Sequence, residues 1–91
     1  MKTLTIIGRA HGETALRIVE EFHKDGDEVA ILFIGRGTHH TARNDVIKQL
    51  DYAELYTMEP EFNSTDERIT ALTYDEIIDL LEKCERTFTW I

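Results

Sequence analysis

Hydrophobic positions along the chain occur in two patterns, one typical of buried strands and one of amphipathic helices. The longest apolar run, Val29–Ile34, has no polar alternation, which indicates a strand buried on both faces, as in a parallel sheet covered by helices. The run stops at Gly35-Arg36-Gly37, which is followed by a polar cluster. A strand, a glycine turn and polar residues before a helix is the order by which open α/β domains place ligand-facing groups at the carboxyl ends of their strands.

The same patterns predict the remaining elements. β-branched and aromatic runs predict strands at Thr3–Ile7, Glu28–Ile34, Ala53–Thr57, Ile69–Leu72 and Arg86–Trp90. Apolar residues at helical spacing predict helices at Glu13–Lys24, near Thr41–Leu50, and after Thr73. The residues of the last helix expected on one apolar face are Tyr74, Ile77, Ile78, Leu81 and Cys84.

Two segments have the spacing of a helix capping box, Ser64–Glu67 and Thr73–Glu76. The alternation of strands and helices predicts an α/β fold with a mostly parallel, five-stranded sheet and helices on both faces. Right-handed crossovers would place the turn after each strand on the same rim of that sheet. At 91 residues the chain is expected to form a single domain spanning 1–91, small enough for self-association to add stability.

Composition narrows the possible partners and the location. The formal charge is −8, with 18 acidic against 10 basic residues, which argues against direct nucleic-acid binding by this chain alone. The single cysteine excludes an internal disulfide and suits a reducing compartment. No apolar run has the length of a signal-peptide core or a membrane span, so a cytoplasmic protein without membrane contact is expected.

Polar residues after the strands form a candidate ligand-binding rim. The residues expected there are Arg9, His11, Arg36, Gly37, Thr38, His39 and His40, with Glu59 and Glu61 nearby. Backbone N–H groups at Gly35–Thr38 would add affinity for a small anion, and the alternative use of the rim is a polar docking surface. A competing interpretation is that these turns are simply polar and exposed. The glycines fit neither GxGxxG nor a Walker motif, so no phosphate loop is predicted.

Metal binding and hydrolytic catalysis are weaker hypotheses for the same residues. His39 and His40 could bind a metal with His11 or Glu59, but adjacent residues seldom direct both side chains at one ion, and no HxxxH or HxH spacing occurs. Solvated turn histidines are therefore preferred, and neither a metal nor a cofactor is expected. A hydrolytic triad lacks its GxSxG elbow.

Three residues near the carboxyl end are further candidates, one for sulfur chemistry and two for a subunit contact. Cys84 is the one candidate for sulfur chemistry, but it lies in phase with apolar residues at a helix C-terminus, where the helix dipole disfavours a thiolate. A structural cysteine is therefore preferred to a reactive one. Phe88 and Trp90 point to the same side of the last strand, which indicates either core cover or a subunit contact.

Four features resemble one protein family. They are GDEVAILFIGRG at Gly26–Gly37, LYTMEPE at Leu55–Glu61, LTYDEIIDLL at Leu72–Leu81, and a chain end with Trp90. Their order and spacing resemble the DsrH/TusB family, the small subunits of the DsrEFH and TusBCD sulfur-relay complexes. None of the four is a catalytic signature.

The resemblance implies a three-layer α/β/α domain that associates with DsrE/TusD-like and DsrF/TusC-like subunits. In such complexes persulfide sulfur travels on a cysteine, chiefly of the DsrE/TusD-like subunit, towards tRNA wobble-uridine 2-thiolation or sulfur oxidation. Some DsrH proteins have a cysteine near the first loop and helix, whereas Gly8–Lys24 here contains none. The family also tends to have an acidic residue before the turn glycine, where this chain has Gly35-Arg36-Gly37.

Three functions are thus compatible with the sequence. The first is a non-catalytic structural subunit of a sulfur-relay complex. The second is a homo-oligomeric module that binds a small anion on the rim and has no part in sulfur transfer. The third is a sulfurtransferase that uses Cys84 itself.

Overall fold

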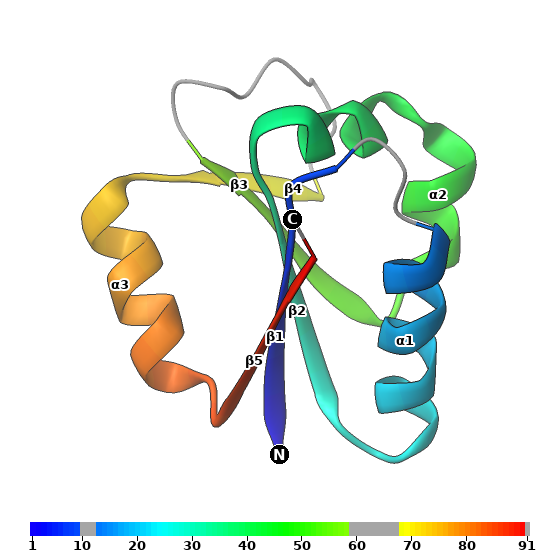
Figure 1. Cartoon of the computed structure of the whole chain (residues 1–91), viewed down its shortest axis with the longest axis horizontal. Helices are drawn as coiled ribbons and strands as arrows, with labels where there is room; N and C mark the ends of the chain where they lie inside the picture. Colours follow the sequence, from blue (N-terminus) through cyan, green and yellow to red (C-terminus); the bar gives the residue numbers. More distant parts are fainter. Residues whose placement is uncertain (10–12, 59–67, 91) are drawn as a thin grey trace.

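The computed structural model describes residues 1–9, 13–58 and 68–90 (Figure 1). Its elements follow the chain as β1 (Lys2–Ile7), α1 (Glu13–Lys24), β2 (Glu28–Phe33), the 3₁₀ helix η1 (Gly35–Ala42), α2 (Asn44–Gln49), β3 (Ala53–Met58), β4 (Ile69–Leu72), α3 (Tyr74–Lys83) and β5 (Arg86–Trp90). All five expected strands are confirmed to within a residue at either end.

The strands form one five-stranded sheet in the order β4-β3-β2-β1-β5, and every neighbouring pair is parallel. Helices α1 and α2 lie on one side of the sheet and α3 lies on the other (Figure 1). The predicted three-layer α/β/α architecture is therefore confirmed. Because the strands are parallel, their carboxyl ends meet at one rim, as the sequence led us to expect.

The central strand β2 explains why its apolar run is unbroken. Val29, Ile31 and Phe33 belong to the core cluster on the α1/α2 side. Ala30 and Leu32 point the other way, into the smaller cluster that packs against α3. Successive side chains of a strand alternate between faces, so a strand covered on both sides needs apolar residues at every position.

The segment after β2 differs from the expected turn and helix. A 3₁₀ helix occupies Gly35–Ala42, and α2 begins only at Asn44. The hydroxyl of Thr38 donates to the Gly35 carbonyl at 2.7 Å, and that of Thr41 donates to the Thr38 carbonyl at 2.6 Å. Bonds to the third residue back match the 3₁₀ period, which explains how a run longer than the usual three or four residues is supported.

The apolar stripe of α3 was predicted wrongly in part. Its buried residues are Ile77, Leu80 and Cys84, whereas Tyr74, Ile78 and Leu81 are 71%, 41% and 38% exposed. Leu80 had not been assigned to the buried face. Only a narrow stripe of one helix can contact a sheet, and Ile77, Leu80 and Cys84 form that stripe here, which leaves the second apolar row in solvent.

The capping box at the start of α3 is confirmed. The Glu76 amide donates to Thr73 Oγ1 at 3.4 Å, and the Thr73 amide donates to Glu76 Oε1 at 3.1 Å. The second of these bonds is the main reason why the pKa of the Glu76 carboxyl is lowered. Ser64–Glu67, the other candidate box, lies outside the described residues.

Thr73→Ala should lower the free energy of unfolding by about 1 kcal/mol, because it leaves a helix N-terminal amide without its side-chain acceptor. Urea denaturation monitored by circular dichroism would measure the loss. Thr70→Ala, at an exposed strand position, is the matched control and should change stability by less than about 0.5 kcal/mol. Equal losses in the two variants would contradict the capping role.

A long-range contact holds the end of α2. Arg68 donates from its guanidinium to the carbonyls of Ile47, Leu50 and Ala53, at 2.6, 2.7 and 3.3 Å. These carbonyls lie at or just beyond the helix C-terminus, where a cation also complements the helix dipole. Arg68 thus fixes α2 beside β3.

No helix within the described ranges has the length and apolar character needed to cross a membrane.

Candidate functional site: a groove between α1 and α2

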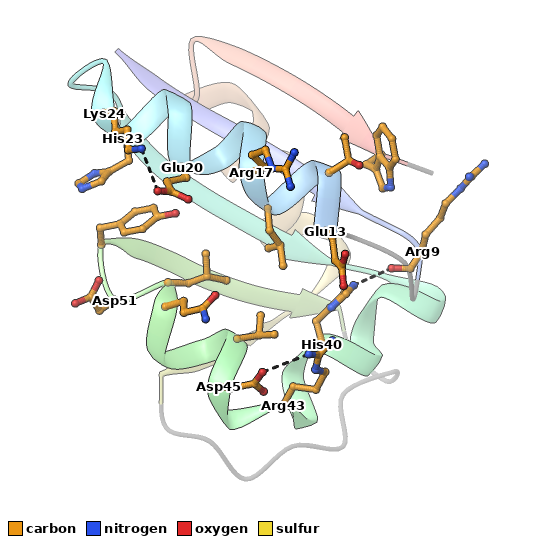
Figure 2. Close-up of a pocket in the computed structure, with 17 residues that line it drawn as sticks. Arg9, Glu13, Arg17, Glu20, His23, Lys24, His40, Arg43, Asp45 and Asp51 are labelled. Atoms are coloured by element: carbon orange, nitrogen blue, oxygen red, sulfur yellow. Dashed lines mark hydrogen bonds and ion pairs between the residues drawn. The ribbon is translucent and has the colours of Figure 1, made fainter.

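A groove of about 1060 Å³ runs between α1 and α2 (Figure 2). Its walls come from the residue Arg9 after β1, from both helices, from η1, from the residues before β3, and from the end of β5. The lining residues are Arg9, Glu13, Thr14, Leu16, Arg17, Glu20, His23, Lys24, His40, Arg43, Asp45, Val46, Gln49, Leu50, Asp51, Tyr52 and Trp90.

One end of the groove is organised around His40. The ring is buried, with 1% of the residue exposed, and its Nε2 lies 3.0 Å from the Arg9 carbonyl oxygen. A carbonyl can only accept, so Nε2 carries the hydrogen in this bond. The ring also lies 5.9 Å from that of Phe33, measured between centroids. His40 therefore ties η1 to the end of β1, and Arg9 extends outward from that end of the groove (Figure 2).

The approach of η1 to β1 depends on Gly37. A Cβ atom at this residue would lie 1.9 Å from the Ile7 carbonyl oxygen and 2.7 Å from its carbon. The Gly37 amide donates to the Ile34 carbonyl at 2.8 Å, and the Ile34 amide donates to the Ile7 carbonyl at 3.0 Å. Glycine is thus required here by the distance between two backbones.

The charges that line the groove balance, with the cations Arg9, Arg17, Lys24 and Arg43 against the carboxylates Glu13, Glu20, Asp45 and Asp51. Two of its cations are paired, Lys24 with Glu20 at 3.2 Å and Arg43 with Asp45 at 3.3 Å. Arg9 and Arg17 form no ion pair with any described residue. The Arg17 guanidinium can donate hydrogen bonds to an anionic ligand, whereas the Arg9 side chain extends away from the groove (Figure 2). Glu13 and Asp51, which also line the groove, would oppose a highly charged ligand.

Aromatic residues lie along the groove wall. The rings of His23 and Tyr52 are stacked, with centroids 4.0 Å apart and planes at 9°. Burial is the main reason why the pKa of the Tyr52 phenol is raised, and the charges of Glu20 and Asp51 add to it. Trp90, at the end of β5, contributes a further aromatic wall.

The structure divides the residues expected on the ligand-binding rim. Arg9 and His40 line the groove, whereas Arg36 and His39 are exposed and lie outside its lining. Gly37 is buried by backbone contacts, and Thr38 donates its hydroxyl within η1. The adjacent histidines, one exposed and one buried, have different environments. His11, Glu59 and Glu61 lie outside the described residues.

In the part of the chain that the structure describes, no three His, Cys, Asp or Glu side chains come close enough together to hold a metal ion.

Several groove residues were missed by sequence reasoning, although α1 carried a signal for them. Glu13, Arg17, Glu20 and Lys24 are spaced by four, three and four residues, so they share one polar face of the helix. Only the position of α2 beside α1 makes that face the wall of a groove.

Phe88 and Trp90, the candidate subunit contacts, are both half-buried on the α1 side of the sheet. Phe88 makes an edge-to-face contact with Phe22 at 6.4 Å between ring centroids. Trp90 packs against the larger core cluster. Both residues thus cover the core, and their predicted part in a subunit contact stays a prediction.

The sole thiol lies near the amino-terminal ends of the strands, opposite the rim at their carboxyl ends. Cys84 is buried at the end of α3, and the next residue, Glu85, donates its amide to the Lys2 carbonyl at 2.9 Å, at the start of β1. Burial is the main reason why the pKa of this thiol is raised. Glu54 raises it further, and Lys2 opposes both. Cys84 is thus buried, as its place on the apolar face led us to expect, and its structural rather than reactive role stays a prediction.

Cys84 should therefore react with a thiol reagent such as DTNB more than about tenfold more slowly in the folded protein than in urea. Absorbance at neutral pH would follow the reaction. Equal rates in the folded and unfolded protein would contradict the buried placement and would restore Cys84 as a candidate sulfur carrier.

An ion pair near the thiol predicts a pH dependence of stability. Lys2 Nζ lies 2.9 Å from Glu54 Oε2, and the Tyr56 hydroxyl donates to the same oxygen at 3.0 Å. The bond to Lys2 is the largest cause of the lowered pKa of the Glu54 carboxyl. This group stabilises the fold above its unfolded pKa of about 4.3, and the contribution is lost as pH falls through its lower folded value.

Glu54→Gln should remove less than about 1 kcal/mol at pH 7, since the carboxylate is half exposed, and should flatten the acid limb of the stability curve below about pH 5. Urea denaturation at pH 3, 5 and 7 would measure both effects. Glu21→Gln, at an exposed position on α1, is the control and should leave the limb unchanged. An acid limb of unchanged slope in Glu54→Gln would show that the pair is not formed in solution.

A scan against protein-family models finds no match for this chain, and a search of curated proteins finds no relative.

Proposed function

We propose that the protein is a non-catalytic structural subunit of a sulfur-relay complex, in which persulfide sulfur is carried by a partner. The supporting observation is the position of Cys84. The only thiol of the chain is buried near the amino-terminal ends of the strands, whereas the Arg9–His40 end of the groove lies at their carboxyl ends. The five-stranded α/β/α fold is of the kind that the resemblance to the DsrH/TusB family implies.

The partners in this proposal are DsrE/TusD-like and DsrF/TusC-like subunits, which would supply the sulfur-carrying cysteine. The pathway would be tRNA wobble-uridine 2-thiolation or sulfur oxidation. The chain itself would contribute shape and contacts to the assembly, and Cys84→Ala would leave sulfur transfer by the complex unchanged.

The decisive experiment is the native mass of the protein, alone and mixed with the DsrE/TusD-like and DsrF/TusC-like proteins of its host. A mixed assembly of fixed stoichiometry is the expected result. A stable homo-oligomer that ignores both proteins would overturn the proposal.

A second candidate is a homo-oligomeric module that binds a small anion. It is favoured by Arg17, a groove arginine without an ion pair among the described residues. Titration with inorganic sulfate, followed by the fluorescence of the single tryptophan, which lines the groove, would test it. Arg17→Ala should weaken binding by about tenfold, whereas Arg36→Ala, outside the groove, should not. An equal effect of the two substitutions would exclude the groove as the site.

A further inference from the structure

The outer surface of α3 carries a row of exposed apolar side chains. Tyr74, Ile78 and Leu81 are 71%, 41% and 38% exposed, and within the described residues Met1 is the only other large hydrophobic residue that is exposed. Their spacing of four and three residues places them on one side of the helix. We call these three residues the α3 ridge. Isolated exposed apolar residues are common, but a continuous row on one helix marks an interaction surface.

The α3 ridge is separate from the face that holds the helix on the sheet. With about 3.6 residues per turn, it lies about a quarter turn from the buried stripe of Ile77, Leu80 and Cys84. The sheet beneath α3 is already covered by that stripe. The fold therefore does not need the ridge residues for its core, and their apolar area stays available for another molecule.

A row of carboxylates borders the ridge. Asp75, Asp79 and Glu82 are all exposed and lie about a further quarter turn around the helix. None of them forms an ion pair with a described residue. The remaining charges of α3 are Glu76, whose carboxylate accepts the Thr73 amide in the capping box, and Lys83. The ridge is thus apolar with an acidic border.

We infer that the α3 ridge docks a partner protein that presents an apolar groove or helix face bordered by Lys or Arg. The apolar row would supply the desolvated centre of the contact, and the carboxylates would select and steer a basic surface. A second copy of this chain is a poorer occupant, because each copy has a formal charge of −8 and would present the same acidic helix. The inference does not depend on the sulfur-relay proposal.

The probe for the test is a designed amphipathic helical peptide with a leucine face bordered by lysines, labelled for fluorescence anisotropy. The reference probe has glutamates in place of the lysines. The lysine peptide should bind the full chain with an affinity that falls as salt is raised, and the glutamate peptide should not bind. Failure of the lysine peptide to bind at low salt would overturn the inference.

Substitutions on α3 show whether the ridge is the binding surface. Ile78→Ser should weaken binding of the lysine peptide by about tenfold, and Asp79→Asn by a few fold with a shallower salt dependence. Glu21→Gln, on α1, removes the same charge elsewhere and should change nothing. Equal effects of Asp79→Asn and Glu21→Gln would mean attraction to net charge only, which would also overturn the inference.

Sedimentation equilibrium of the protein alone distinguishes the second copy from a basic partner. We expect the wild-type chain either to be monomeric or to associate through another surface. In both cases Ile78→Ser should have the same oligomeric state as the wild type. A dimer that Ile78→Ser dissociates would show that the occupant is another copy of this chain. Ile78 is 41% exposed, so Ile78→Ser should lose less than about 1.5 kcal/mol, and a cooperative urea denaturation curve would verify that the variant is folded.

Discussion

Phe33→Ala should lower the free energy of unfolding by about 3–5 kcal/mol, one of the two largest losses we expect from a single substitution. Phe33 has no exposed area and ends β2, with β1 on one side and β3 on the other. Its ring belongs to the cluster beneath α1 and α2. Removing it leaves a cavity that fixed strands on both sides prevent from closing. A domain of this size has roughly 5–14 kcal/mol in total, so the variant would be close to unfolding.

Two further variants serve as comparisons for the loss of unfolding free energy in Phe33→Ala. Phe33→Leu keeps most of the volume and should cost less than about 1.5 kcal/mol. Phe88→Ala removes the same ring from a half-buried position on the edge strand β5, so its loss should be smaller than that of Phe33→Ala. Urea denaturation at neutral pH would measure all three. If Phe33→Ala and Phe88→Ala were equally mild, β2 would not be the buried centre of the sheet.

The groove end should also respond to Phe33→Ala, because the ring lies against that of His40. The bond from His40 Nε2 to the Arg9 carbonyl requires a fixed imidazole orientation. In a destabilised but folded variant, the imidazole NMR signals of His40 should therefore shift. Those of His23, stacked on Tyr52, should not shift.

Elements with a strong local pattern of apolar residues could be predicted from the sequence. The unbroken run of β2 indicated burial on both faces, and the alternation of β5 indicated that Phe88 and Trp90 would lie on the same side of the sheet. Helix α1 was located to the residue, at Glu13–Lys24, because its apolar spacing is regular and Gly26 follows it. In each case a local pattern and the tertiary contacts require the same conformation.

Other features depend on contacts that no local pattern contains. The row Ile77–Leu80–Cys84 and the row Tyr74–Ile78–Leu81 are both apolar and both helical in period, so packing against the sheet decides which is buried. Arg68 holds the end of α2 from about twenty residues away, which no short-range rule would show. The 3₁₀ helix has no apolar period of its own.

In the candidate site, too, some features follow from the sequence pattern and others only from tertiary packing. The topology places the strand ends at one rim, and Arg9 and His40 do line the groove there. Whether a polar residue faces the groove is then decided by the rotation of each helix about its axis. Arg36 and His39 point elsewhere for this reason, and the polar face of α1 enters the site.

Gly37→Ala should cost about 3 kcal/mol or more, at the upper end of overpacking effects, because the obstructing atoms are backbone. The new Cβ would meet the Ile7 carbonyl at 1.9 Å, so η1 and the end of β1 would have to separate. Separation would strain the hydrogen bond from the Ile34 amide to Ile7 and, further along η1, the bond from His40 to Arg9. Loss of stability and a changed His40 NMR signal should therefore occur together.

Gly35→Ala is the matched control for Gly37→Ala, two residues away in the same segment. Gly35 has φ of +50°, and its nearest contact to an added Cβ is the Gly8 carbonyl oxygen at 4.0 Å. An alanine there meets no obstruction and adds only the left-handed backbone strain, about 1–2 kcal/mol. Urea denaturation should thus rank Gly37→Ala as clearly worse than Gly35→Ala. The reverse order would mean that η1 does not lie against β1, and the His40 end of the groove would then have to be rebuilt.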